Sequence, residues 1–157
     1  MTAIATADHV LTIAQDMFSA MIDGEPGLVT WWGGESAIIL EPVNAWVDVQ
    51  SAEPVRALVT TERATAEHIT RALLGMEPEE SVAGEDMQDA FGEIANVIGG
   101  NLKGLMPEGG TLTLPIVTSG PPGMPGTPAW ECQLAWRAAP IVISMWHLPT
   151  DGKEPTP

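Results

Sequence analysis

A carboxylate and a carboxamide stand three residues apart near the middle of the chain. Glu93 and Asn96 belong to a segment with the pattern Asp-x3-Glu-x2-Asn, which begins at Asp89. On a helix, side chains three residues apart point in the same direction. The pair could therefore meet one partner molecule with a charged acceptor and with a group that both donates and accepts hydrogen bonds. The same pattern is also typical of an ordinary solvent-exposed helix, and the spacing alone leaves both interpretations open.

Other constellations that carry chemistry are missing from the sequence. It has no Gly-rich phosphate loop and no Gly-x-Ser-x-Gly segment. The histidines His9, His68 and His147 are scattered, with no ligand spacing between any two of them, so we expect no bound metal. Cys132 lies in a predicted strand without a neighbouring histidine, and we interpret it as a small core residue.

The helix that must carry Glu93 and Asn96 is predicted from 85 to 106. A helical wheel centred on Asp89 places one apolar stripe on the opposite side, which is typical of a helix packed on a core. The stripe consists of Met87, Phe91, Ile94, Ile98, Leu102 and Leu105. The face away from the stripe consists of Asp89, Glu93, Asn96, Gly100 and Lys103.

Four glycines lie inside this predicted helix, and each costs about 0.5–1 kcal/mol relative to alanine. They are Gly92, Gly99, Gly100 and Gly104. Gly100 shares the face of Glu93 and Asn96, where a missing side chain lets another surface come close. Gly99 and Gly104 could instead serve tight packing against a sheet.

Two further helices are predicted from apolar residues that recur every three or four positions. The first spans 7–23, with Thr6 as a possible cap and Gly24 at its end. The second spans 61–74 and ends at Gly75.

The predicted strands come mostly in pairs. Gly33-Gly34 separates two apolar runs, 28–32 and 37–41, and this pattern predicts a hairpin. Further strands are predicted at 45–50, 55–60, 111–118, 130–137 and 141–147, with a turn at 51–54. Paired strands combined with helices favour an α+β fold, in which long helices pack on an antiparallel sheet of about six strands.

Composition narrows the classes of function. The 157 residues fit one domain over 1–148, followed by a Pro- and charge-rich tail over 149–157. Acidic residues number 21 against six basic ones, and the net charge of −15 repels nucleic acids and anionic membranes. No apolar run is long enough to span a membrane, and the first ten residues do not form a signal peptide. The lone Cys132 fits a reducing cytoplasm, where we expect the protein to work.

Two motifs that follow one another along the chain resemble those of a known protein family. Glu93 and Asn96 are followed by Gly-Gly-Asn-Leu-Lys at 99–103, and then by a Pro-x-Val-x-x-Gly element from Pro115 to Gly120. Together they resemble the CheX branch of the CheC/CheX/FliY family of chemotaxis phosphatases, whose members carry Glu-x2-Asn on a long exposed helix. The resemblance covers roughly residues 43–120.

Two segments depart from that family pattern. The stretch 72–102 contains seven acids and no base, which is more acidic than expected for the family. The stretch 24–42, which includes Trp31-Trp32, has no clear counterpart; one of the two tryptophans could be exposed at an interface.

The resemblance implies a phosphatase that hydrolyses the aspartyl phosphate of a CheY-like response regulator. Asn96 matches the residue that positions the attacking water, and Glu93 matches the acid expected to pair with a lysine of the regulator. Asp89 and Gly100 would then bind the same partner. The regulator would hold a Mg²⁺ ion, and this chain would bind no cofactor of its own.

The resemblance also implies a possible homodimer, because members of the CheX branch tend to associate through sheet edges. The alternative function is a member without catalysis, which binds a response regulator or dimerises as a module of a signalling pathway. Receiver domains present an acidic pocket, which a chain of net charge −15 would approach slowly at low salt. This charge is the reason to keep the alternative.

Overall fold

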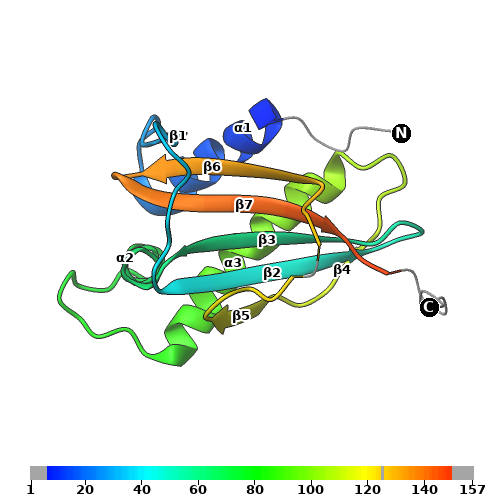
Figure 1. Cartoon of the computed structure of the whole chain (residues 1–157). Coiled ribbons are helices and arrows are strands. Elements are labelled where there is room, and N and C mark those ends of the chain that lie inside the picture. Colours follow the sequence, from blue (N-terminus) through cyan, green and yellow to red (C-terminus); the bar gives the residue numbers. More distant parts are fainter. Residues whose placement is uncertain (1–6, 125, 150–157) are drawn as a thin grey trace.

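Strands far apart in the sequence lie side by side in the computed structural model, which describes residues 7–124 and 126–149. The strands are β1 (Val29–Trp31), β2 (Pro42–Gln50), β3 (Val55–Glu62), β4 (Thr111–Leu112), β5 (Ile116–Ser119), β6 (Trp130–Trp136) and β7 (Ala139–His147). They form one sheet in the order β1-β6-β7-β3-β2, and both β4 and β5 pair with the outer side of β2 (Figure 1). Every pairing is antiparallel.

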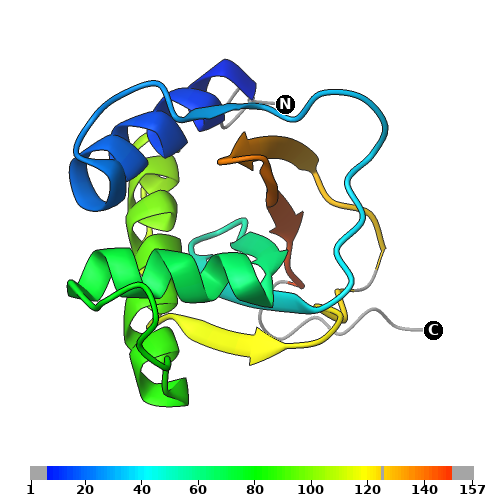
Figure 2. The same ribbon diagram turned by 90° about the vertical axis from the view of Figure 1, so that its left-hand side faces the viewer.

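Three helices cover one face of this sheet (Figure 2). They are α1 (Ala7–Phe18), α2 (Arg63–Leu74) and α3 (Gly84–Gly104), and a π-helical turn (Ser19–Asp23) continues α1. The fold is therefore α+β with an antiparallel sheet, as predicted, and the sheet has seven strands where about six were expected.

The core lies between the helices and the sheet because the strands alternate in burial. In β2 the side chains of Val43, Ala45, Val47 and Val49 are buried on the helical side. Successive side chains of a strand point to opposite faces, so Trp46 and Asp48 lie on the other face. The same alternation in β3, β6 and β7 completes an apolar layer for the helices to cover.

The connection from β1 to β2 crosses the other face of the sheet, opposite the helices (Figure 2). The backbone N–H of Ala37 donates a hydrogen bond to Oε1 of Gln133, and the N–H groups of Leu40 and Glu41 donate to the carboxylate of Glu62. The hairpin predicted for 28–32 and 37–41 is therefore wrong. Residues 37–41 form no strand, because β1 pairs with β6 and the chain must then cross the sheet to reach β2.

The two adjacent tryptophans of this region differ in exposure. Trp31, in β1, is exposed. Trp32 is half-buried, and its indole N–H donates a hydrogen bond to the carbonyl of Glu35. One exposed tryptophan of the pair agrees with the sequence prediction.

The predicted strand 111–118 is two strands rather than one. β4 ends at Leu112 and β5 begins at Ile116, so the regular strand pairing with β2 is interrupted between them, although Thr113 still bonds to Asp48 of β2. Pro115 has no N–H group to donate to a neighbouring strand, which accounts for the break.

Element boundaries also differ from the sequence prediction. Helix α3 ends at Gly104 instead of 106, and Leu105 is exposed rather than part of the buried stripe. Thr61 and Glu62 belong to β3 rather than to the following helix. Gly24 ends the first helical region, as predicted, and the structure shows it in a left-handed conformation. The proposed cap Thr6 lies outside the described residues.

The domain boundaries stay a prediction. Most of the proposed tail, 150–157, lies outside the described residues. Within the part of the chain that the structure describes, no helix combines the length and the apolar character needed to cross a membrane.

Candidate functional site

Helix α3 packs on the sheet with one apolar side and leaves the opposite side open. Its buried side chains include Met87, Phe91, Ile94, Ile98 and Leu102. On the open side Asp89 and Glu93 are exposed, and Asn96 and Gly100 are half-buried. These four residues follow one another at spacings of three or four, so they form one row along the helix. The row of Asp89, Glu93, Asn96 and Gly100 is called the polar face of α3 below.

Gly99 allows α3 to lie close to the sheet. A Cβ atom at this position would overlap Cγ2 of Val47 in β2. Gly92 lies next to β5, since a Cβ there would stand 3.4 Å from Cβ and Cγ of Pro115, in van der Waals contact. Close packing at Gly99 agrees with the sequence prediction. The same role is wrong for Gly104, where a Cβ would meet nothing within 4 Å.

Gly100 has no comparable constraint from within the fold. A Cβ at Gly100 would lie 3.7 Å from Cδ1 of Leu112, which is an ordinary van der Waals contact. A glycine inside a helix costs about 0.5–1 kcal/mol relative to alanine, and no packing contact offsets that cost here. The missing side chain leaves the helix backbone open on the polar face.

Asn96 differs from the other two asparagines of the chain in the state of its carboxamide. Asn44 is buried and donates to the carbonyl of Gly120 over 2.7 Å. Asn101 donates through Nδ2 to the carbonyl of Val97, one turn earlier in α3. Among the described residues, the Asn96 side chain has no hydrogen-bond partner. Its carboxamide is therefore free to bind a water or another molecule.

The polar face is acidic toward the N-terminal end of α3. Glu85 and Asp86 stand in the first helical turn, where carboxylates interact favourably with the helix dipole. Within the described residues, neither Asp89 nor Glu93 has an ion pair or a side-chain hydrogen bond. Lys103 stands in the last turn, at the other end of the helix. The Glu93 carboxylate is therefore available to a cation of another molecule.

Strand β5 is fixed beside α3 by a hydrogen-bonded cluster around the buried Asn44. The hydroxyl of Thr60 donates to Oδ1 of Asn44 over 2.8 Å, and Nδ2 of Asn44 donates to the carbonyl of Gly120. The N–H of Gly120, a residue with φ of 90°, donates to the carbonyl of Pro42. These bonds hold the end of β5 on β2, so Pro115 keeps its place against Gly92.

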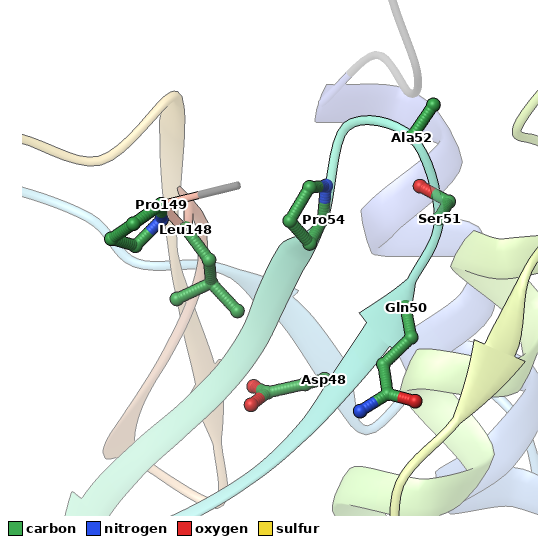
Figure 3. Close-up of a pocket in the computed structure, with 7 residues that line it drawn as sticks. All are labelled: Asp48, Gln50, Ser51, Ala52, Pro54, Leu148 and Pro149. Atoms are coloured by element: carbon green, nitrogen blue, oxygen red, sulfur yellow. The ribbon is translucent and has the colours of Figure 1, made fainter. Parts of the chain in front are cut away.

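The residues of the polar face are exposed or half-buried along one side of α3. A hollow of about 370 Å³ lies elsewhere, at the turn between β2 and β3, next to Leu148 and Pro149 (Figure 3). No residue of α3 lines it. Asp48 lines this hollow, and its carboxylate forms an ion pair with Arg56 over 2.7 Å. An exposed helix face suits contact with a protein surface better than it suits a small ligand, which binds in concave sites.

Within residues 7–124 and 126–149, no three His, Cys, Asp or Glu side chains come together in a way that could hold a metal ion. Cys132 is buried in β6, as predicted. Burial raises the pKa of its thiol above the usual value, and the neighbouring Glu131 carboxylate adds to that effect. The thiol is therefore a poor nucleophile.

One exposed residue beside the polar face was missed by the sequence analysis. Leu114 lies between β4 and β5 and is 86% exposed. A leucine in an apolar run looks like a strand residue in the sequence. The only local signal is the proline that follows it, which removes one hydrogen-bond donor from the strand edge.

The sequence comparison identifies one family. Residues 43–125, which are more than half of the chain, match the family model described as chemotaxis phosphatase CheX. No curated protein matches the chain.

Solved structures of chemotaxis proteins share the fold at low sequence identity. A structure from Borrelia burgdorferi, a CheX-CheY-BeF3-Mg²⁺ complex, aligns with a TM-score of 0.68 and 14% identity, over 94% of this chain and 100% of that one. The chemotaxis protein CheX from Vibrio vulnificus aligns with a TM-score of 0.67 and 16% identity, over 94% of this chain and 100% of that one. The chemotaxis protein CheX from Desulfovibrio desulfuricans aligns with a TM-score of 0.66 and 18% identity, over 90% of this chain and 98% of that one.

Proposed function

The chain belongs to the CheX family of chemotaxis phosphatases, and we propose that it hydrolyses the aspartyl phosphate of a CheY-like response regulator. The relative from Borrelia burgdorferi forms a complex with CheY, which supports a regulator of this kind as the partner. In the proposed complex the polar face of α3 enters the phosphate pocket of the regulator.

An aspartyl phosphate is an activated acyl phosphate, so its hydrolysis needs no nucleophile from the protein. Water attacks the phosphorus atom, the bond to the aspartyl oxygen breaks, and the products are aspartate and inorganic phosphate. The remaining task is to hold the water in line with the bond that breaks. The Asn96 carboxamide can accept a hydrogen bond from that water and donate one to a phosphoryl oxygen.

Glu93 has a docking role in this proposal. Its carboxylate lies one turn before Asn96 and would pair with a lysine of the regulator, which fixes how the two proteins meet. Asp89 extends the same row of side chains and would contact the rim of the partner. Gly100 leaves room for the partner next to Asn96. The Mg²⁺ ion would belong to the regulator, as the Mg²⁺-containing complex of the Borrelia burgdorferi relative suggests.

The free carboxamide of Asn96 is the observation that supports catalysis most directly. It stands on the open side of a helix, next to an unpaired carboxylate, and binds nothing within the described part of the chain.

The test is a phosphate-release assay. A CheY-like receiver is phosphorylated with a small-molecule donor and Mg²⁺, and its decay is followed with and without the protein. We expect faster decay with the wild type and a loss of at least about 100-fold in Asn96→Ala, as for other residues that stabilise a transition state. Asn101→Ala is the matched control, because it removes a second carboxamide from α3 away from the polar face.

Two results would contradict the proposal. Equal loss in both variants would mean that Asn96 acts through the stability of α3. Binding of the phosphorylated receiver without faster decay would contradict catalysis and support the alternative, a regulator-binding module without enzymatic activity.

Dimerisation and location complete the proposal. β1 pairs only with Leu134–Trp136 of β6, so the edge of β6 from Trp130 to Cys132 has no strand beside it in the described structure. An open strand edge can pair with a second copy. We expect a mass of twice 16.6 kDa in light scattering at micromolar concentration, and a monomer would contradict this part. The free Cys132 fits a cytoplasmic location.

A further inference from the structure

An apolar side chain stands almost fully in solvent between β4 and β5. Leu114 is 86% exposed, more than any other large apolar residue in the described part of the chain. Single exposed leucines are common on protein surfaces. The surroundings of Leu114 distinguish it from those cases in two respects, its anchorage and its place beside α3.

The residues on both sides of Leu114 are firmly held. The N–H of Thr113 donates to the carbonyl of Asp48 over 2.9 Å, and the N–H of Asp48 donates to Oγ1 of Thr113 over 2.9 Å. Pro115 follows and packs on Gly92 of α3. Because the backbone is already ordered on both sides, little conformational entropy would be lost if Leu114 were buried by a partner.

The same contacts place Leu114 beside the polar face. Leu112 lies against Gly100, and Pro115 lies against Gly92. The segment between them therefore runs along the part of α3 that contains Glu93 and Asn96. A protein that covers those two residues also meets the edge of the sheet at 112–115.

We propose that Leu114 is an apolar docking residue for the same response regulator that the polar face of α3 engages. This inference rests on the proposed function, since it assumes that the regulator covers the polar face. The occupant is a folded receiver domain with an apolar patch next to its phosphate pocket. The acidic polar face offers contacts to cations, and Leu114 adds contact area that does not depend on charge.

Leu114 carries no group that could take part in the reaction. Its contact is the same in the ground state and in the transition state, so it contributes to binding and not to the chemical step. Truncation should raise Kd and KM and leave kcat unchanged. The opposite pattern, a lower kcat with unchanged Kd, is expected for Asn96→Ala.

The experiment compares Leu114→Ala with Leu40→Ala. Leu40 is 82% exposed and lies on the connection that crosses the other face of the sheet, so it is a matched control for the loss of an exposed leucine. Binding is measured to a CheY-like receiver treated with beryllofluoride and Mg²⁺, and phosphate release is measured in parallel. We expect Leu114→Ala to raise Kd about tenfold at unchanged kcat, and Leu40→Ala to have no effect.

Three results would overturn the inference. Unchanged Kd in Leu114→Ala, together with a loss of catalysis in Asn96→Ala, would reject the docking residue and leave the proposed function intact. Equal weakening by both leucine variants would show a loss unrelated to this position. No binding of any receiver by the wild type would reject the proposed function and this inference with it. Both leucines are exposed, so both variants should retain the wild-type Tm.

Discussion

Glu93 and Asn96 differ in what each can contribute to a complex. The carboxamide of Asn96 is neutral and can both donate and accept hydrogen bonds, whereas the carboxylate of Glu93 only accepts and carries charge. The same row on α3 thus offers one group suited to holding a water and one suited to pairing with a cation. In the proposed mechanism Asn96 therefore serves the chemical step and Glu93 serves docking.

The charge of Glu93 gives a prediction about binding. Glu93→Gln keeps the size of the side chain and removes the charge needed for the proposed ion pair with the regulator, so the affinity for a phosphorylated receiver should fall about tenfold. Binding is measured by titration calorimetry at low salt. Glu108→Gln, just beyond the C-terminal end of α3, is the control and should bind as the wild type. An unchanged affinity in Glu93→Gln would contradict the docking role.

At the scale of elements, the position of α3 depends on the absence of a side chain at Gly99. Gly99→Ala places a Cβ on Cγ2 of Val47, and such overpacking typically costs about 1–3 kcal/mol. The free energy of unfolding should fall accordingly in urea denaturation. Adding Val47→Ala removes the overlapping methyl group, so Gly99→Ala should cost less in that background. Additive effects of the two substitutions would contradict the contact.

Gly100 should respond in the opposite way. Gly100→Ala adds only an ordinary contact with Leu112, so the better helix former should raise the free energy of unfolding by about 0.5–1 kcal/mol. The same methyl group stands on the polar face and should weaken binding of the phosphorylated receiver. Higher stability together with weaker binding is the expected result, measured by urea denaturation and by titration. Unchanged binding would mean that the partner does not approach the helix there.

The success of the sequence analysis varied between elements for physical reasons. Helix α3 was predicted well because its apolar residues recur with the helical period, and the same period separates Glu93 and Asn96 from the core. The prediction of a hairpin over 28–32 and 37–41 was wrong because local glycines indicate a turn but do not identify the partner of a strand. β1 pairs with β6, and no local pattern contains that information. The roles of Glu93, Asn96, Asp89 and Gly100 stay predictions.

At the scale of the whole molecule, the net charge of the protein affects how fast it associates with a partner. The net charge of −15 repels any partner protein that is also acidic, and salt screens this repulsion. The association rate constant with an acidic receiver should therefore rise several-fold as salt increases from low to physiological concentration and above. Stopped-flow measurements at several salt concentrations test this prediction. A rate constant that falls with salt would show that local attraction dominates over net charge.

The pairing of β1 with β6 has a consequence for the order of synthesis. Val29 faces Trp136 in this ladder, so a chain still on the ribosome holds β1 long before its partner strand exists. Asp23 also lacks its hydrogen-bond partners until that stage of synthesis, because its carboxylate accepts hydrogen bonds from Trp136 and Arg137. β1 is therefore synthesised well before it can be paired. A nascent chain stalled before Trp136 would expose the unpaired edge of β1 to chaperones and proteases.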